Sequence, residues 1–214
     1  MSKNYRESGI ARVFDRNSAE REARRFLRKG LDSRIRHIID ALGPDRLKGS
    51  TVLDVGCGVG ALHQSLILAG ARRIVGVDAS LNNITVAQEL AAKLKYSDYV
   101  NHFVGDVVEL EELLPCSDVV ILDRVVCCCP SVVDLLKFVL AKCNCTLIIT
   151  IPQVNLATVG FQLLFNASMW ITRNEFRYVL HDPVTVTNRV LKDGFVANRV
   201  ATSYPWEATV YRRC

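Results

Sequence analysis

Three alternating glycines constrain this chain more than any other feature of its sequence. Gly56, Gly58 and Gly60 follow an apolar segment at 51–55 and precede a segment with helical character at 60–70. A turn made of glycines has no side chains in the way, so its backbone N–H groups can approach a ligand closely. The pattern predicts a buried strand, a ligand-binding turn and a helix in succession.

Two carboxylates indicate which ligand this turn binds. Asp78 ends a second apolar strand at 73–77, where, in a βαβ unit, a carboxylate can accept hydrogen bonds from both hydroxyls of a ribose. The first two glycines and Ala61 also satisfy the pattern of NAD-binding turns, but Asp54 would repel a pyrophosphate. A cofactor with ammonium and sulfonium groups would be attracted instead. We therefore expect an adenosyl cofactor that carries positive charge.

The run Asp-x-Gly-x-Gly-x-Gly at 54–60, followed by Gly-Val-Asp at 76–78, resembles the cofactor site of class I S-adenosylmethionine-dependent methyltransferases. Gly105-Asp106 and Asp123 end two further predicted strands, and ligands of such sheets bind at the carboxyl ends of the strands. The resemblance implies S-adenosylmethionine as cofactor. We expect it to be bound by Asp54, Gly56, Cys57, Gly58, Gly60, Asp78, Ala79, Asp106, Val107, Asp123 and Arg124.

Apolar runs alternate with helical segments along most of the chain, which is typical of an α/β fold. Strands are predicted at 51–55, 73–77, 101–105, 118–122 and 145–151, with helices at 60–70, 81–95, 109–114 and 131–142. Segments 195–203 and 206–213 are predicted to close the chain as an antiparallel pair. We therefore expect a Rossmann-like class I methyltransferase fold: a mostly parallel seven-stranded sheet with an antiparallel last strand and helices on both faces.

The first part of the chain differs in character from the rest. Residues 1–50 carry the excess of Lys and Arg that makes the net charge +5. A helix is predicted to begin at Asn17 or Ser18 and to end at Gly30, and a second to span 32–42. We expect 1–47 to form an N-terminal helical lid, with Tyr5, Phe14 and Arg16 near its start, and 48–214 to form the methyltransferase domain.

Composition excludes several classes of protein. Half of the residues are hydrophobic, but no apolar run is as long as a membrane span, and no signal pattern begins the chain. Eight cysteines without regular spacing favour a reducing, cytoplasmic location. The triplet 127–129 and the pair Cys143 and Cys145 are expected at opposite edges of the sheet, so no metal site is expected.

A long apolar and aromatic stretch at 153–182 follows the fifth strand and is expected to be an insertion on the substrate side. Three segments resemble magnesium-protoporphyrin O-methyltransferases: Val-Phe-Asp-Arg at 13–16, the segment that ends in Pro130, and this insertion. At the position of Cys128 that family commonly has a histidine. We expect the acceptor to be bound by Cys128, Phe161, Arg173, Arg177 and His181.

These features predict an enzyme that methylates a small, partly hydrophobic molecule on a carboxylate or a hydroxyl group. No catalytic residue is assigned, and His181 is the most available base for an acceptor that needs one. Two alternatives remain: an RNA or protein methyltransferase that docks through the basic N-terminal arm, and a non-catalytic S-adenosylmethionine-binding protein. Nucleic acid is the less expected partner, and monomer and dimer both remain open.

Overall fold

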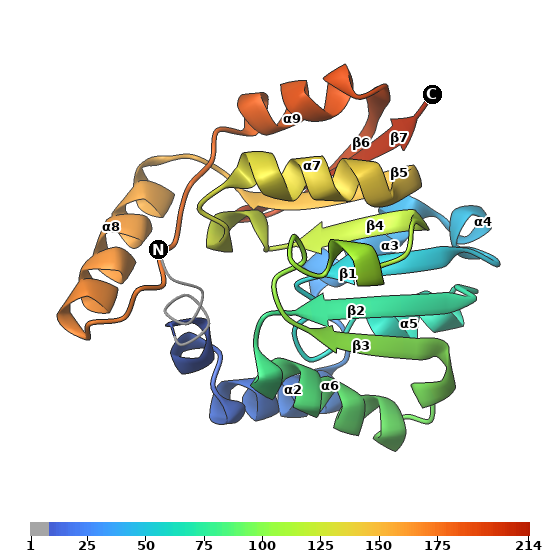
Figure 1. Cartoon of the computed structure of the whole chain (residues 1–214), viewed down its shortest axis with the longest axis horizontal. Helices are drawn as coiled ribbons and strands as arrows, with labels where there is room; N and C mark the ends of the chain where they lie inside the picture. The colour runs from blue at the N-terminus through green and yellow to red at the C-terminus, as the bar shows by residue number, and fades with distance from the viewer. Residues whose placement is uncertain (1–8) are drawn as a thin grey trace.

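The computed structural model of the chain describes residues 9–214. Its centre is one sheet with the strand order β3-β2-β1-β4-β5-β7-β6 (Figure 1). The strands are β1 (Thr51–Val55), β2 (Arg73–Asp78), β3 (Val100–Val104), β4 (Ser117–Asp123), β5 (Cys143–Pro152), β6 (Phe195–Ser203) and β7 (Trp206–Arg213). Neighbours from β3 to β5 are parallel, whereas β7 is antiparallel to both β5 and β6. The predicted sheet is confirmed.

Helices cover both faces of this sheet, as predicted (Figure 1). They are α2 (Arg16–Lys29), α3 (Ser33–Leu42), α4 (Pro44–Leu47), α5 (His63–Leu68), α6 (Leu81–Lys93), α7 (Val132–Lys142), α8 (Leu156–Ile171) and α9 (Pro183–Lys192). Three 3-10 turns lie between them: η1 (Ser97–Tyr99), η2 (Glu111–Leu113) and η3 (Val126–Cys128). Residues 9–13 are also helical.

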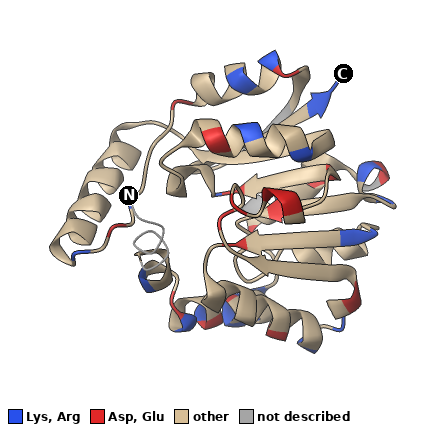
Figure 2. Cartoon of the chain, in the orientation of Figure 1, with Lys and Arg blue, Asp and Glu red and all other residues tan. Residues whose placement is uncertain are grey.

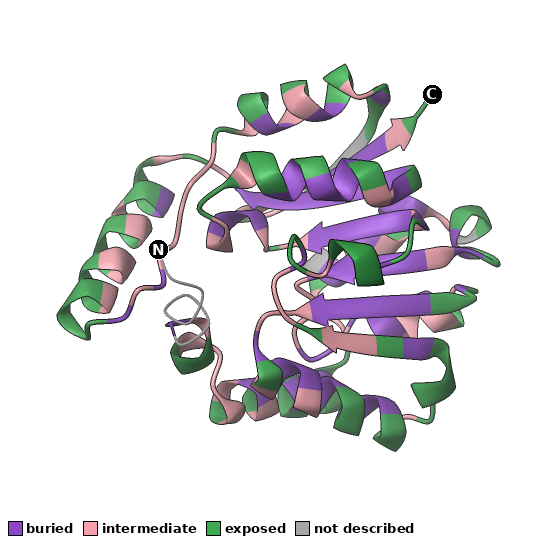
Figure 3. Ribbon diagram, viewed as in Figure 1, coloured by how far each residue is buried: buried purple, intermediate pink, exposed green. Residues whose placement is uncertain are grey.

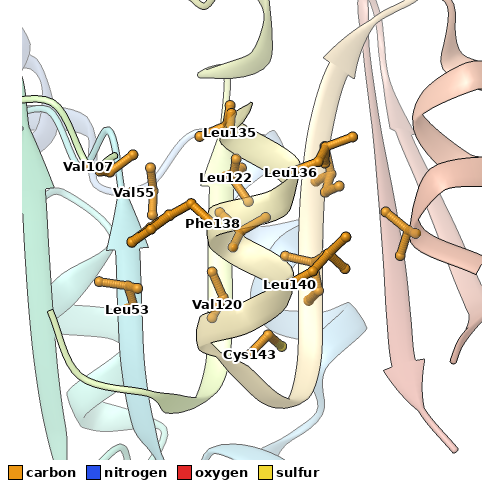
Figure 4. Close-up of a cluster of buried hydrophobic side chains, with 14 of the residues drawn as sticks. Leu53, Val55, Val107, Val120, Leu122, Leu135, Leu136, Phe138, Leu140 and Cys143 are labelled. Carbon is orange, nitrogen blue, oxygen red and sulfur yellow. The ribbon is translucent and has the colours of Figure 1, made fainter. Parts of the chain in front are cut away.

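The strands bury alternate residues on opposite faces, because successive side chains of a strand point in opposite directions. Leu53 and Val55 belong to a core cluster with α7 and α9, part of which Figure 4 shows around Phe138. Val52 of the same strand belongs to a second cluster, with α3, α4, α5 and α6. Both faces of the central strands are therefore apolar, which explains their nearly continuous hydrophobic sequence (Figure 3).

Three predicted helices differ from the structure in their bounds or type. The start of α2 is capped by Asp15, whose carboxylate accepts the N–H of Ser18 at 2.7 Å, so Asn17 and Ser18 already lie in the first turn. The helix predicted at 109–114 is only the 3-10 turn η2, because Leu114 precedes Pro115 and adopts extended backbone. The helix predicted at 60–70 shortens to α5, since the glycine turn continues to Leu62. The short helix α4 was not predicted.

The N-terminal helices pack on the same side of the sheet as α6. Ala19 and Ala23 of α2 form a small buried cluster with Val86 of α6 and Val59 of the glycine turn. Tyr5 lies outside the described residues. Across residues 9–214, no helix has both the length and the apolar composition that crossing a membrane requires.

Candidate functional site

The glycine turn between β1 and α5 is shaped by positive backbone angles. Gly56 has φ 67° and Gly58 has φ 55°, a region that residues with a side chain rarely adopt. A Cβ atom at Gly56 would collide with the side chain of Val125, which follows β4. A Cβ atom at Gly58 would meet nothing within 4 Å. Gly58 therefore presents its backbone to open space, where a ligand can approach it.

Asp78, at the end of β2, is built into this turn. Its Oδ2 atom accepts the N–H of Gly58 at 2.9 Å, and its Oδ1 atom accepts the N–H of Ser80 at 2.8 Å and Nδ2 of Asn83 at 3.2 Å. Burial raises the pKa of Asp78, and these three donors act in the opposite direction. The carboxylate is thus fixed beside Gly58, as the expectation of a ribose site requires.

Asp54 lies at the other side of the turn and is 2% exposed. Its Oδ2 atom is 3.1 Å from Nε2 of His63, the fully buried first residue of α5. The space that His63 occupies depends on Gly76 of β2, since a Cβ atom there would lie 2.8 Å from the imidazole ring. The histidine therefore fixes the orientation of the Asp54 carboxylate from beneath the turn.

A cavity of about 860 Å³ opens at the carboxyl edge of the sheet, above this turn. Ten of the residues expected to bind the cofactor line it: Asp54, Gly56, Cys57, Gly58, Asp78, Ala79, Asp106, Val107, Asp123 and Arg124. Gly60 does not line it and instead lies against His63. Of the expected acceptor residues, Cys128 and Phe161 line the cavity. One cavity thus joins the glycine turn to the insertion.

The insertion forms an aromatic wall opposite the glycine turn. Phe161 and Phe165 of α8 stack with ring centroids 5.7 Å apart, and Tyr178 meets the Phe161 ring edge-on at 5.3 Å. Phe176 contacts Phe165 and also the ring of Phe14, at 5.9 Å. This wall gives the half of the cavity next to the insertion a largely apolar surface.

The N-terminal segment closes one side of the same cavity. Ile10 and Val13 line it. The carbonyl of Phe14 accepts hydrogen bonds from Ser80 Oγ at 2.9 Å and Asn82 Nδ2 at 3.3 Å, both of which follow β2. Phe14 therefore links the loop after Asp78 to the aromatic wall.

Three residues expected to bind the acceptor do not line the cavity. Arg173 is exposed after the end of α8. The Arg177 guanidinium donates to the backbone carbonyls of Asn174 and Phe176, and Nε2 of His181 lies 2.9 Å from the carbonyl of Cys129. The side chains of Arg177 and His181 therefore contact the backbone of the insertion and of the cysteine triplet.

The cysteine triplet lines the cavity after β4. The Sγ atoms of Cys127 and Cys128 are 3.8 Å apart, and the hydrogen bond from Cys127 lowers the pKa of the Cys128 thiol. Cys143 and Cys145 lie at the start of β5, at the other edge of the sheet, as expected. Within residues 9–214, no group of three or more Cys, His, Asp or Glu side chains could hold a metal ion.

The cavity is acidic. The carboxylates of Glu22, Glu109 and Asp134 line it together with the aspartates already named, and Arg124 is the one basic side chain among its described lining residues. Figure 2 shows red segments gathered where the central strands end. Such a surface attracts a positively charged ligand and repels an anionic one.

Some lining residues were not predicted from the sequence. They include Asn83 of α6 and Trp206 at the start of β7. Asn83 could have been found, because it stands one turn into the helix that follows Asp78. Nothing in the sequence alone places the Tyr204–Trp206 turn beside the insertion.

Comparisons with known proteins agree with this geometry. Residues 46–175 match the family described as "Methyltransferase domain". A ubiquinone biosynthesis O-methyltransferase of Methylobacterium sp. (strain 4-46) is 35% identical over 139 residues, which are 64% of this chain and 51% of that protein. A probable protein arginine N-methyltransferase 3 of Oryza sativa subsp. japonica is 48% identical over 54 residues, 24% of this chain and 9% of that protein. The chain thus spans about half of the first of these relatives and less of the second.

Among solved structures, magnesium protoporphyrin IX methyltransferase from Synechocystis PCC 6803 with bound SAH superposes with a TM-score of 0.72. The match covers 98% of this chain and 100% of that one at 20% identity, so it shows a shared fold. An O-methyltransferase family protein from Burkholderia thailandensis also has a TM-score of 0.72, at 15% identity, over 95% of this chain and 62% of that one. The chain therefore belongs to the methyltransferase domain family, the class I enzymes that take their methyl group from S-adenosylmethionine.

Proposed function

We propose that this chain transfers a methyl group from S-adenosylmethionine to the hydroxyl oxygen of a small, partly apolar molecule. The observation that carries the proposal is the single cavity with two different halves. One half has the glycine turn and fixed carboxylates, and the other has the aromatic wall. A methyl donor and an apolar acceptor can therefore lie side by side in one enclosure.

In this proposal the cofactor lies across the carboxyl ends of β1, β2 and β4. Asp78 accepts hydrogen bonds from the ribose hydroxyls, and the open face of Gly58 admits the cofactor against the backbone. Asp54 and Asp123 place negative charge at the end of the site nearest the cysteine triplet, where the ammonium and sulfonium groups would lie. Asp106, after β3, is then left for the adenine end.

Cavity charge favours a hydroxyl over a carboxylate as the acceptor group. An anionic acceptor would approach several carboxylates, with Arg124 as the one basic group among the described lining residues. Arg173 and Arg177, which were expected to bind an anion, do not line the cavity. The Methylobacterium relative, which is 35% identical over 64% of this chain, is named an O-methyltransferase, which also supports oxygen as the acceptor atom.

Methyl transfer requires few chemical groups from the protein, because the sulfonium is already an excellent leaving group. The chain must align the acceptor oxygen with the methyl carbon and keep water away. The aromatic wall and Cys128 would orient the acceptor. We propose that 1–47 act as the lid of the 48–214 domain, with Phe14 closing the gap between the cofactor loop and the wall.

The alternative of an RNA or protein acceptor that docks on the basic arm has less support. Arg16 is paired with Glu20 at 2.7 Å and with Glu89 at 2.8 Å, and Arg24 is paired with Glu20 at 3.1 Å. These ion pairs reduce the positive field of α2, and the cavity beside it is acidic. The match to arginine methyltransferases covers a short segment and says nothing of the acceptor.

One labelling experiment separates these functions. The protein is incubated with methyl-labelled S-adenosylmethionine and, in separate reactions, with phenolic and other hydroxylated small molecules, RNA and protein extract. The proposal expects label in a small hydroxylated product. Label in RNA or protein only, with binding that weakens steeply as salt rises, would contradict it in favour of docking through the basic arm. Cofactor binding without transfer to any acceptor would favour the non-catalytic alternative.

A further inference from the structure

The helix α8 has an apolar surface that no described part of the chain covers. We define its outer face as Leu156, Val159, Leu163, Leu164, Trp170 and Ile171, whose positions repeat with the period of a helix and so share one side. Five of these side chains, all except Val159, are between 67% and 92% exposed. Thr158 is the one residue of α8 that is buried. Such a concentration of large exposed apolar side chains marks an interaction surface.

The opposite side of α8 belongs to the cavity. Thr158, Phe161 and Phe165 line it, and their spacing places them away from the outer face. Figure 1 shows α8 at the margin of the molecule, away from the sheet. One helix therefore presents an apolar face outward and the wall of the acceptor site inward.

Charge on and around the helix distinguishes the occupants that this surface suits. The chain has no charged residue from Cys143 to Thr172, and Figure 2 shows α8 without any blue or red segment. Directly after the helix, Arg173 is exposed, and the Arg12 guanidinium donates to its backbone carbonyl at 3.5 Å. Two arginines thus lie together at the end of α8 that carries Trp170 and Ile171.

We propose that the outer face of α8 docks the protein on the surface of an anionic lipid bilayer. A helix that lies in the interface buries its apolar face among the acyl chains, while nearby arginines meet anionic headgroups and a tryptophan occupies the boundary between them. The apolar contact would come from Leu156, Leu163, Leu164 and Ile171. Trp170 would lie at the boundary, and the positive charge would come from Arg12 and Arg173. The net charge of +5 adds a general attraction to the same surface.

This docking deepens the proposed function and rests on it, because an acceptor with an apolar body dissolves in the bilayer. With the outer face in lipid and the inner face in the cavity, such an acceptor would reach Phe161 and Phe165 along one helix. The docking test below contains no acceptor and no cofactor turnover. Failure to dock therefore leaves the methyl-transfer proposal standing, and failure to methylate leaves the docking result standing.

The test measures how the full chain partitions onto vesicles by flotation. Vesicles of phosphatidylcholine alone are compared with vesicles that also contain phosphatidylglycerol. We expect wild type to float with the anionic vesicles, and its Trp170 fluorescence to be quenched by brominated lipid. Leu163→Glu should lower the partition coefficient on the order of tenfold or more, since it replaces an inserted leucine with a charge.

Leu68→Glu is the matched control, because Leu68 is 81% exposed and belongs to α5, a helix that lies far from α8 in Figure 1. It introduces the same charge at a leucine that is at least as exposed as Leu163 and should leave partitioning unchanged. Circular dichroism and affinity for S-adenosylhomocysteine should be the same for both variants and wild type, since neither leucine lines the cavity.

Three results would overturn the proposal. The first is that wild type stays in solution with both kinds of vesicle. The second is that Leu163→Glu and Leu68→Glu have an equal effect on flotation. The third is a wild-type dimer in light scattering that Leu163→Glu converts to monomer, without vesicle binding by either form. That outcome would assign the outer face of α8 to contact between two copies of the chain.

Discussion

Replacement of Asp78 by asparagine tests the cofactor site at the atoms that build it. Both carboxylate oxygens already accept N–H groups, from Gly58 on one side and from Ser80 and Asn83 on the other. In Asp78→Asn, one oxygen becomes an NH2 group that faces a donor. The side chain keeps its volume, so the change is in hydrogen bonding and charge and not in packing.

The size of the effect follows from the bonds to the cofactor that are lost or weakened. A hydrogen bond to a charged group contributes about 1.5–3 kcal/mol. At about 1.4 kcal/mol per factor of ten, loss of one such bond from the ribose raises the dissociation constant about 10- to 150-fold. The adenine and methionine parts of the cofactor would still bind, so we expect weaker binding and not its complete loss.

The assay is calorimetric titration with S-adenosylhomocysteine, at a temperature where circular dichroism shows each variant to be folded. Asp118→Asn is the control. The Asp118 carboxylate also accepts two hydrogen bonds, from the N–H and hydroxyl of Thr51, but it lies near the start of β4, at the opposite edge of the sheet. Its affinity should equal that of wild type. A folded Asp78→Asn protein with affinity within about twofold of wild type would refute the ribose assignment.

Three further changes test other parts of the site. Gly58→Val should abolish S-adenosylhomocysteine binding in calorimetry, because φ 55° disfavours a side chain and the added atoms would enter the open side of the turn. Retained affinity would count against placement of the cofactor beside Gly58. Deletion of residues 1–14, which keeps the Asp15 cap, should leave the fold intact by circular dichroism, raise the cofactor dissociation constant and lower turnover; unchanged values of both would show that the segment is no lid. The pKa of the Cys128 thiol is lowered, so its alkylation by iodoacetamide should reach its half-maximal rate at a lower pH than the alkylation of an ordinary cysteine does. Peptide mass spectrometry measures this rate, and bound S-adenosylhomocysteine should protect Cys128 from alkylation. An ordinary pH midpoint without protection would contradict this.

Sequence patterns predicted the fold because its signals are local. The strand ends at Asp54, Asp78, Asp106 and Asp123 each follow a buried apolar run, and parallel strands bring their carboxyl ends to one edge. The error at the start of α2 came from competition between neighbouring caps. Asp15, Asn17 and Ser18 can all accept a hydrogen bond from a helix N-terminus, and in the structure Asp15 is the residue that caps the helix.

The acceptor half of the cavity was harder to predict, because its residues converge from distant segments. Phe161 lines the cavity, but Arg177 and His181 are turned to backbone carbonyls by the path of the chain after α8. Composition alone cannot show that path. The acidic character of the cavity likewise depends on Glu22 and Asp134, which lie on helices that approach the site only in the folded chain.

The central claim is that the glycine turn and Asp78 bind S-adenosylmethionine. Calorimetric titration of the full chain with S-adenosylmethionine, S-adenosylhomocysteine and NAD tests it most directly. We expect saturable binding of the two sulfur-containing ligands at one site per chain and no binding of NAD. Binding of NAD by a protein that binds neither of the other two would contradict it.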